Sequence, residues 1–594
     1  MNLKNKVIEN FENSSEQIDL KEMSGVTNPS FDQENDENTQ NLSEDAVLRR
    51  NQPNQSYFAD ERIRIPHSES QYFSFKKLWA FTGPGFLMSI AYLDPGNIES
   101  DLQSGTKAKY SLLWILLSAT VLGLLMQRLA ARLGVVSGLN LAEMCHRQYR
   151  KLPRLLLWIM VEVAIIGSDM QEVIGTAIAI YLLSNKAVPL WVGVLITIAD
   201  TFTFLFLDKY GLRKLELFFG LLIGVMAITF GYEYIISKPD QLELLEGMFL
   251  PICTNCDANA LVPAVGIIGA VIMPHNLYLH SALVKSREID RKDRNKVKEA
   301  NMYFFVEACI ALFVSFVINV FVVAVFAHGL FKVKNNEIIE KCSHYPSING
   351  SVFPNNDDYV DADLYKGGIF LGCTFGLAAM YIWAVGILAA GQSSTMTGTY
   401  AGQFAMEGFL NLQWARWRRV LLTRTIAIVP TFLLAFYTRI EDLTNMNDIL
   451  NAVMSLQLPF ATIPTIAFTS NSEIMGEFVN GWVNKLVATL LSVVVIGVNT
   501  YTVINTVGNL PLNWALLVLI ISFGILYLLF CVYLMIHMAV SMGAERLLRY
   551  NSVKRFVMVQ EDTQSIISPH GYSNARMEIP TDFTSTTDLY SNKF

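Results

Sequence analysis

Long apolar stretches separated by short polar segments fill most of the chain after about residue 70. A helix needs about 20 mostly apolar residues to cross a bilayer, and twelve segments meet this requirement. They lie near residues 78–98, 111–131, 155–183, 189–207, 216–236, 260–284, 301–329, 369–398, 420–437, 446–469, 486–506 and 513–538. The pattern therefore predicts an all-α polytopic membrane protein whose membrane domain covers residues 71–545.

Two of these segments are interrupted by proline and polar residues. Asp94-Pro95-Gly96-Asn97 interrupts the first segment, and Met273-Pro274-His275-Asn276 interrupts the sixth. Proline removes a backbone donor and glycine weakens a helix, so both helices should unwind there and free the carbonyls of Ala91 and Ala270. A carboxylate at this depth is costly and by default marks a functional site. Paired breaks of this kind indicate the binding site of a secondary transporter.

The breaks lie five spans apart, and five is an odd number. Two five-span units that each begin with a broken helix then have opposite orientations, which is the LeuT-type 5+5 inverted repeat. The repeats should cover about residues 78–236 and 260–469. The eleventh and twelfth spans should be two additional, peripheral helices.

Basic residues predict which side of the membrane each loop faces. They cluster after the second, fourth, sixth and eighth spans, at Arg132, Arg147, Arg150, Lys151, Arg154, Lys209, Arg213, Lys214, Lys285, Arg287, Arg291, Lys292, Arg294, Lys296, Lys298, Arg416, Arg418 and Arg419. The positive-inside rule places these loops and both termini in the cytoplasm. The tails, 1–70 and 546–594, are then cytoplasmic, and the polar first tail should be disordered. The loop 330–368 is extracytoplasmic, and its sequon at Asn349 should be glycosylated.

Composition agrees with a membrane protein, because 52% of residues are hydrophobic and only 16% are charged. Soluble domains carry about 25% charged residues. The net charge of −7 is uninformative, since much of the acid lies in the tails. Cys253 and Cys256 predict a local disulfide rather than a zinc site, and the other five of the seven cysteines are expected to be packing residues.

The residues at the breaks form a mixed set of metal ligands. Asp94 and Asn97 offer oxygen atoms, as do the carbonyls of Ala91 and Ala270, while Met273 offers a thioether. Such a set favours manganese, iron, cobalt and cadmium over magnesium and calcium. A methionine in an apolar helix is usually a packing residue, so Met273 gains its interest from the break beside it.

Three acids in the third span indicate a second polar site. Glu162, Asp169 and Glu172 lie seven and three residues apart, so a helix places them on one stripe. Arg424 of the ninth span is the expected partner. The group can be a proton route or a static buried salt-bridge cluster that holds the helices together.

Two other classes of protein fit the sequence less well than a metal transporter. A sodium-coupled amino-acid transporter shares the fold, but Asp94 would repel the carboxylate of such a substrate. A membrane enzyme would need clustered histidines, whereas the eight histidines are scattered. His275 and His280 lie five apart and share no helical face, so at most one should lie near the metal pathway, and His280 can equally be structural. No nucleotide-binding motif is present, which leaves membrane potential or a coupled ion as the driving force.

The chain resembles the natural resistance-associated macrophage protein family, and most of all its animal proton-coupled divalent metal transporters. The resemblance rests on Asp94-Pro95-Gly96-Asn97, on residues 270–281 and on Gln457-Leu458-Pro459-Phe460-Ala461, and it covers roughly residues 70–545. It implies import of iron(II), manganese(II), cobalt and cadmium together with protons by alternating access, with no permanently bound cofactor.

The resemblance also implies roles for individual residues. The metal ligands are Asp94, Asn97, Met273 and the carbonyls of Ala91 and Ala270, with Asn451 standing where some relatives have a glutamine. The implied proton route starts at Asp94, passes near His275, and leaves through Glu162, Asp169, Glu172 and Arg424. A signalling receptor of this family would need a large cytoplasmic domain, for which 546–594 is too short.

Short motifs in the C-terminal tail bear on the compartment. Tyr550-Asn551-Ser552-Val553 fits a tyrosine-type sorting signal, and Asp562 before Ile566-Ile567 fits an acidic dileucine signal. Sorting adaptors are therefore expected partners besides metal ions, protons and lipid, and nucleic acid is not. The expected locations are the plasma membrane, the endosomal-lysosomal membrane, or both.

Overall fold

The structure is a computed structural model that describes residues 63–66, 73–207, 212–253, 258–345, 352–411, 416–437, 440–508 and 514–549. Cys256, Asn349, the two sorting motifs and most of both predicted tails lie outside these ranges. Apart from two isolated bridges, Ile63 with Arg287 and Lys334 with Tyr359, the described residues form helices and no strand.

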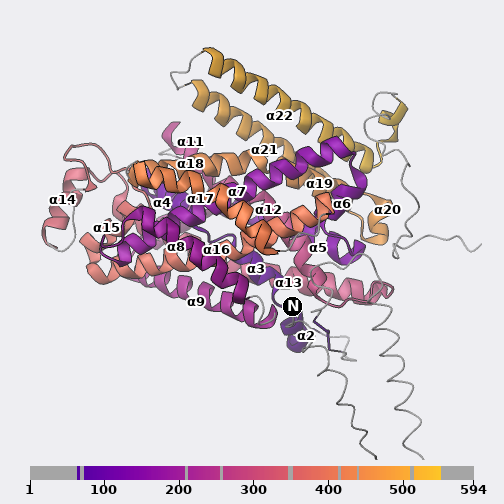
Figure 1. Ribbon diagram of the computed structural model, residues 1–594, viewed down its shortest axis with the longest axis horizontal. Coiled ribbons are helices and arrows are strands. Elements are labelled where there is room, and N and C mark those ends of the chain that lie inside the picture. Colours follow the sequence, from indigo (N-terminus) through magenta and orange to yellow (C-terminus); the bar gives the residue numbers. More distant parts are fainter. Residues whose placement is uncertain are drawn as a thin grey trace, which may run out of the picture. The chain divides into compact units, whose positions relative to one another are not determined.

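The helices that make up the membrane domain are long and apolar, except where they are broken (Figure 1). They are α3 (Pro84–Ile90), α4 (Pro95–Ala108), α5 (Leu113–Ser137), α7 (Lys151–Leu183), α8 (Leu190–Leu207), α9 (Leu212–Ser237), α11 (Ala258–Val271), α12 (Pro274–Leu283), α13 (Arg294–Leu330), α15 (Leu364–Phe375), α16 (Leu377–Leu410), α17 (Arg416–Tyr437), α18 (Ile440–Gln457), α19 (Pro459–Thr469), α21 (Trp482–Gly508) and α22 (Trp514–Ser541). Shorter helices connect them: α2 (Phe75–Phe81), α6 (Leu141–Gln148), α10 (Gln241–Phe249), α14 (Asn335–Ser343), α20 (Ser472–Met475), η2 (Val284–Ser286), η4 (Gly476–Phe478) and η5 (Glu545–Arg549).

Eight helical segments in the described ranges are long and apolar enough to cross a membrane by themselves. The other four predicted spans correspond to the broken pair α3/α4, to α7 with its buried acids, to α8 and to α17. The apolar part of α17, Leu421–Tyr437, is a shorter segment. The predicted all-α membrane fold is therefore confirmed. The four other spans include the first broken helix and α7 with its acids, whereas the sixth span, Pro263–Ser286, is apolar enough despite its break.

The packing of the helices has the symmetry of an inverted repeat. Helix α13 packs against α4 as α5 packs against α12, and α18 packs against α11 as α9 packs against α3. Likewise α18 packs against α7 as α9 packs against α16. Each pair is related by exchanging the first five spans with the second five. This exchange brings the two broken helices together at the centre, where α11 contacts α4 and α12 contacts α3.

The last two helices lie outside the repeats, at the outer edge of the domain (Figure 1). Both α21 and α22 pack on α19, and few side chains of α22 are buried, as expected of a helix that faces lipid. The predicted peripheral position of the two extra helices therefore agrees with the packing.

Two further helix breaks were not predicted from the sequence. The segment expected as one span near 369–398 consists of α15 and α16, separated at Gly376, whose φ of 95° is easily adopted only by glycine. The segment near 446–469 consists of α18 and α19, which begins at Pro459. The N–H group at the first position of a helix has no partner within the helix, so a proline, which lacks this group, can begin α19 without loss of a hydrogen bond.

The cysteine prediction needs one correction. Cys342 of α14 and Cys373 of α15 form a disulfide, so these two are not simple packing residues. They are 31 residues apart, and no local spacing signals the pair. Cys253 is disulfide-bonded as predicted, while its predicted partner lies outside the described ranges.

Candidate metal site

The first break places a carboxylate and an amide in a fully buried position. Helix α3 ends at Ile90 and α4 begins at Pro95, with Asp94 as its N-terminal cap. One carboxylate oxygen of Asp94 accepts a hydrogen bond from the backbone N–H of Asn97 at 2.9 Å. Oδ2 of Asp94 and Oδ1 of Asn97 are buried and have no partner among the described residues. Two buried oxygen atoms are therefore free to bind a cation. Buried polar atoms without a hydrogen-bond partner are rare, because leaving them unpaired is costly.

The second break lies directly against the first. The side-chain amide of Asn97 donates to the carbonyl of Ala270 at 3.0 Å, in the last turn of α11. Three residues later Met273 caps α12, and its buried side chain packs with Ala164 and Met454. Ala91 is the C-terminal cap of α3, and helix ends leave carbonyls without an intrahelical partner. The structure thus brings Asn97 into contact with Ala270 and places Ala91 and Met273 at the edges of the same two breaks.

Asn451 of α18 also reaches the first break, but through hydrogen bonds to protein. Its amide nitrogen donates to the carbonyl of Gly96 at 3.2 Å and to the hydroxyl of Ser100 at 2.9 Å. Its carbonyl oxygen accepts from the amide of Gln171 at 2.7 Å. Both polar atoms of the side chain are engaged, so in this conformation Asn451 ties α18 to α4 and α7.

A second polar site lies where α7, α16 and α17 meet. The Arg424 guanidinium is 3.2 Å from Glu172 and 3.4 Å from Asp169, and it donates to the carbonyl of Thr395 at 2.7 Å. The hydroxyl of Ser394 donates to Glu172 at 2.7 Å. All of these side chains are buried. The expected association of Arg424 with the α7 acids is therefore present.

Small residues allow the close approach of α16 to this network. A Cβ built on Gly398 would lie 2.8 Å from a carboxylate oxygen of Asp169. The network also adjoins the first break, because a Cβ on Gly96 would lie 2.6 Å from the amide of Gln171, the residue directly before Glu172. The break and the acids of α7 are thus neighbours in space.

Glu162, the third predicted acid of α7, lies nearer the start of that helix. It is half-buried and accepts a hydrogen bond from the indole N–H of Trp158 at 3.0 Å. Its greater exposure distinguishes it from Asp169 and Glu172, which are 2% and 1% exposed.

The two histidines of α12 occupy different surroundings. His275 follows Pro274 in the first turn, is buried, and its Nδ1 has no partner within the described ranges. His280 shares a 2.8 Å hydrogen bond with the side chain of Gln127, whose amide donates to the Tyr92 hydroxyl at 3.4 Å. His275 is therefore the histidine beside the predicted metal ligands, and His280 faces α5.

Several residues of the site were not predicted. Gln171, Ser394 and Thr395 complete the polar networks, and their only sequence signal is that polar residues recur on α7 and α16 within apolar spans. The described residues contain no group of three or more His, Cys, Asp or Glu side chains that could hold a metal. A search for the usual ligand clusters would therefore miss this site, whose predicted ligands include an amide, carbonyls and a thioether.

Comparison with known proteins agrees with this geometry. A family model described as "Natural resistance-associated macrophage protein-like" matches residues 85–505. The chain is 69% identical to protein Malvolio of Drosophila melanogaster over 519 residues, which cover 86% of this chain and 87% of that protein. It is 61% identical to natural resistance-associated macrophage protein 2 of Homo sapiens over 492 residues, 82% of this chain and 86% of that protein.

A solved structure shares the fold. The crystal structure of the Eremococcus coleocola manganese transporter, in complex with an aromatic bis-isothiourea compound, superimposes with a TM-score of 0.69 at 30% identity. The match covers 81% of this chain and 98% of that one. With the paired breaks, the buried mixed ligand set and these similarities together, the chain belongs to the natural resistance-associated macrophage protein family and is a transporter of divalent metals.

Proposed function

We propose that the protein imports iron(II) and manganese(II), and also cobalt and cadmium, into the cytoplasm together with protons. The observation that carries the proposal is the pair of unpartnered, buried oxygen atoms on Asp94 and Asn97, held against the second break by the bond from Asn97 to Ala270. Helix ends that face a cavity near the middle of the membrane are the usual ion sites of transporters with this repeat.

The ligand set accounts for the preference for transition metals. Asp94 supplies the charge, Asn97 and the carbonyls of Ala91 and Ala270 supply further oxygen atoms, and Met273 supplies sulfur. Calcium and magnesium gain little from sulfur, and magnesium gives up its water reluctantly. Since Asn97 donates its amide N–H to Ala270, its Oδ1 atom stays available to the metal.

Asn451 is proposed to contribute mainly by positioning. Its amide holds the backbone of Gly96 and the side chain of Ser100, so it fixes the first turn of α4 behind Asp94 and Asn97. To act as a ligand itself, it would have to exchange its bond with Gln171 for one with the metal.

The acids of α7 are proposed to carry the proton away from Asp94. The order along the helix fits this role: Gln171 and Glu172 adjoin the first break, Asp169 follows, and half-buried Glu162 lies closest to the end that the positive-inside rule places in the cytoplasm. His275 stands beside Met273, where a proton leaving the metal site can reach it. Metal binding at Asp94 favours the loss of its proton, because a dication stabilises the negative charge.

The static salt-bridge interpretation makes a different prediction. Arg424 lies within 3.4 Å of both Glu172 and Asp169. If this group only holds the helices together, neutralising Glu172 should lower stability and leave proton movement unchanged. If the group carries protons, the same change should reduce proton movement.

The proposed orientation has independent support from the disulfides. Cys342 lies within the loop 330–368 that the basic residues place outside the cytoplasm, and its disulfide partner Cys373 lies in the helix that follows this loop. Disulfides persist in oxidising compartments. The proposed locations remain the plasma membrane and the endosomal-lysosomal membrane, reached through adaptors that bind the tail motifs.

Calorimetry of manganese(II) binding to the purified protein tests the site. Asp94→Asn removes the only proposed charged ligand and should abolish measurable binding. Asp101→Asn is the matched control, because Asp101 lies on the same helix and is equally buried but two turns away, and it should keep the wild-type affinity. Wild-type affinity in Asp94→Asn would show that the metal binds elsewhere.

A further inference from the structure

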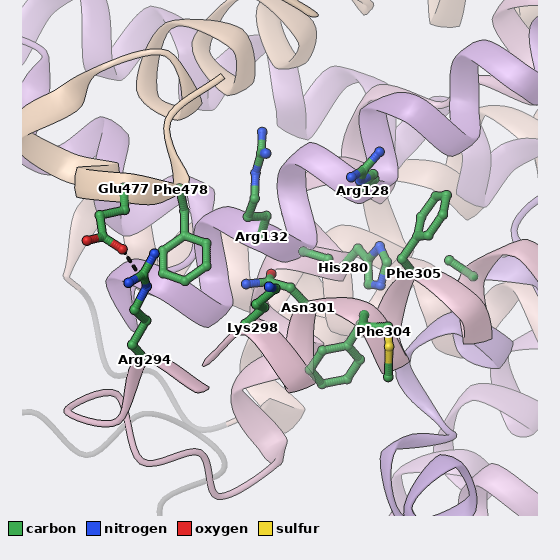
Figure 2. Close-up of a pocket in the computed structure, with 13 residues that line it drawn as sticks. Arg128, Arg132, His280, Arg294, Lys298, Asn301, Phe304, Phe305, Glu477 and Phe478 are labelled. Carbon is green, nitrogen blue, oxygen red and sulfur yellow. Dashed lines mark ion pairs between the residues drawn. The ribbon is translucent and has the colours of Figure 1, made fainter. Parts of the chain in front are cut away.

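A cavity of about 450 Å³ lies between α5, α12, α13 and η4, outside the metal site (Figure 2). Arg128 and Arg132 of α5 and Arg294 and Lys298 of α13 line it, together with Glu477 of η4. His280 of α12 also contributes to the lining. Four cationic side chains thus share this space with one carboxylate.

The positive charge of this basic cavity is only partly neutralised. Arg294 pairs with Glu477 at 2.6 Å, and Arg132 donates to Asn480, but the buried Nε of Arg132 has no partner within the described ranges. Arg128 packs over the ring of Phe305 at 4.6 Å, an arrangement that leaves its N–H groups free to donate at the edge. Lys298 is exposed. The cavity therefore suits an anion with several acceptor oxygens, such as a phosphate group.

An apolar face on α13 continues from the basic cavity. Met302 lines the cavity, and Ile310 and Phe313 follow it at helical spacing on the same side. These three side chains are 43%, 45% and 65% exposed, so they face lipid. This apolar face offers room for acyl chains next to the site for a phosphate. A soluble anion would not use the apolar face.

The cavity also lies at the right depth for a lipid headgroup. It is formed by the end of α5 and the start of α13, on the side that the positive-inside rule assigns to the cytoplasm. Anionic lipids are concentrated in the cytoplasmic leaflet, and basic pockets between membrane helices bind their headgroups. As a route for a metal dication, in contrast, four cations would be repulsive.

We propose that this basic cavity binds the phosphorylated headgroup of an anionic phospholipid from the cytoplasmic leaflet, with the acyl chains along the Met302–Phe313 face of α13. A bound headgroup bridges α5, α13 and the connection between α19 and α21. It also contacts the wall formed by His280, which is linked through Gln127 to Tyr92 in the first break. Lipid bound there is thus in a position to influence the broken helix, and its binding does not depend on the metal ligands.

Titration of the purified full-length protein with a fluorescent dioctanoyl phosphatidylinositol bisphosphate tests the proposal. Lys298→Gln and Arg128→Gln should each weaken binding about fivefold, the effect expected for one cation near a lipid phosphate. Lys296→Gln is the matched control: it makes the same change on the same helix, but Lys296 pairs with Asp290 and does not line the cavity. It should bind the lipid like the wild type.

Two comparisons decide the outcome. Free inositol trisphosphate should bind more weakly than the lipid, because it lacks the acyl chains; equal affinity would overturn the lipid assignment in favour of a soluble phosphate. Equal weakening by Lys296→Gln and Lys298→Gln would show diffuse surface attraction instead of a site. If neither Lys298→Gln nor Arg128→Gln weakens lipid binding, the proposal is also overturned.

Discussion

At the scale of single residues, most groups of the proposed metal site are neutral ligands. Asp94 provides one buried carboxylate, whereas Asn97, Met273 and two carbonyl groups are proposed as neutral ligands. A site with a single negative charge holds a dication less tightly than one with several carboxylates, which suits an ion that must be released on the other side of the membrane. Selectivity then depends on the kind of neutral ligand, and Met273 is the soft one.

Replacing the thioether should change selectivity more than transport itself. Met273→Ala should lower cadmium affinity about tenfold, the size typical of losing a supporting contact to a metal, while manganese uptake largely survives on the oxygen ligands. Calcium should then compete with manganese where it could not before. Uptake of manganese against rising calcium in cells that express each variant measures this.

Met454→Ala is the control for that experiment. Met454 of α18 packs in the same small cluster as Met273 but belongs to neither break, so its loss should leave cadmium affinity and calcium competition unchanged. If Met273→Ala behaves like Met454→Ala, the sulfur of Met273 is a packing atom.

At the scale of the helices, a buried arginine holds the start of the first broken helix. Arg287 donates to the carbonyls of Ala80 and Thr82 and to Glu216 of α9. Beside it, Glu307 of α13 accepts from the N–H groups of Gly83 and Gly85 at the start of α3. These bonds connect α2 and α3 to α9 and α13.

Breaking this connection should be costly. Arg287→Met removes the arginine from its buried pair with Glu216, and the loss of one partner of a buried pair costs about 3–5 kcal/mol. Arg294→Met removes one partner of the pair between Arg294 and Glu477, whose side chains are 66% and 62% exposed. This change should lower the free energy of unfolding by only about 0–1 kcal/mol. Thermal unfolding of both variants in detergent compares them. Equal melting temperatures would show that the Arg287 bonds do not stabilise this connection between the helices.

At the scale of the whole molecule, the inverted repeat could be predicted because the sequence features that indicate it are local. The breaks at Asp94 and Met273 each consist of proline and polar residues within an apolar run, and Arg424 was paired with the α7 acids because a charge in a span needs a partner. Those features do not depend on how distant segments pack.

The features that were missed depend on tertiary packing. Cys342 and Cys373 meet only because α14 folds back on α15. The break before Pro459 was not predicted because proline is tolerated within membrane helices. The Asn451 bonds to Gly96 and Gln171, and the basic cavity, each combine residues from separate spans, so the basic residues indicated sidedness but not a site.

The orientation of the whole molecule predicts where sugar is attached. Asn349 should be glycosylated and Asn54, a sequon in the predicted cytoplasmic tail, should not. Asn349→Gln should abolish a glycosidase-sensitive shift in gel mobility, whereas Asn54→Gln should leave it unchanged. The opposite pattern would place the termini outside the cytoplasm.

Proton-coupled metal uptake by purified protein in sealed vesicles tests the central claim most directly. Vesicles without ATP, with a pH-sensitive dye inside, are given manganese(II) at two external pH values. Acid outside should accelerate manganese entry, and the interior should acidify as the metal enters; Glu172→Gln should reduce the acidification. Manganese entry that is unaffected by the proton gradient and carries no proton, or that needs ATP, would contradict the account.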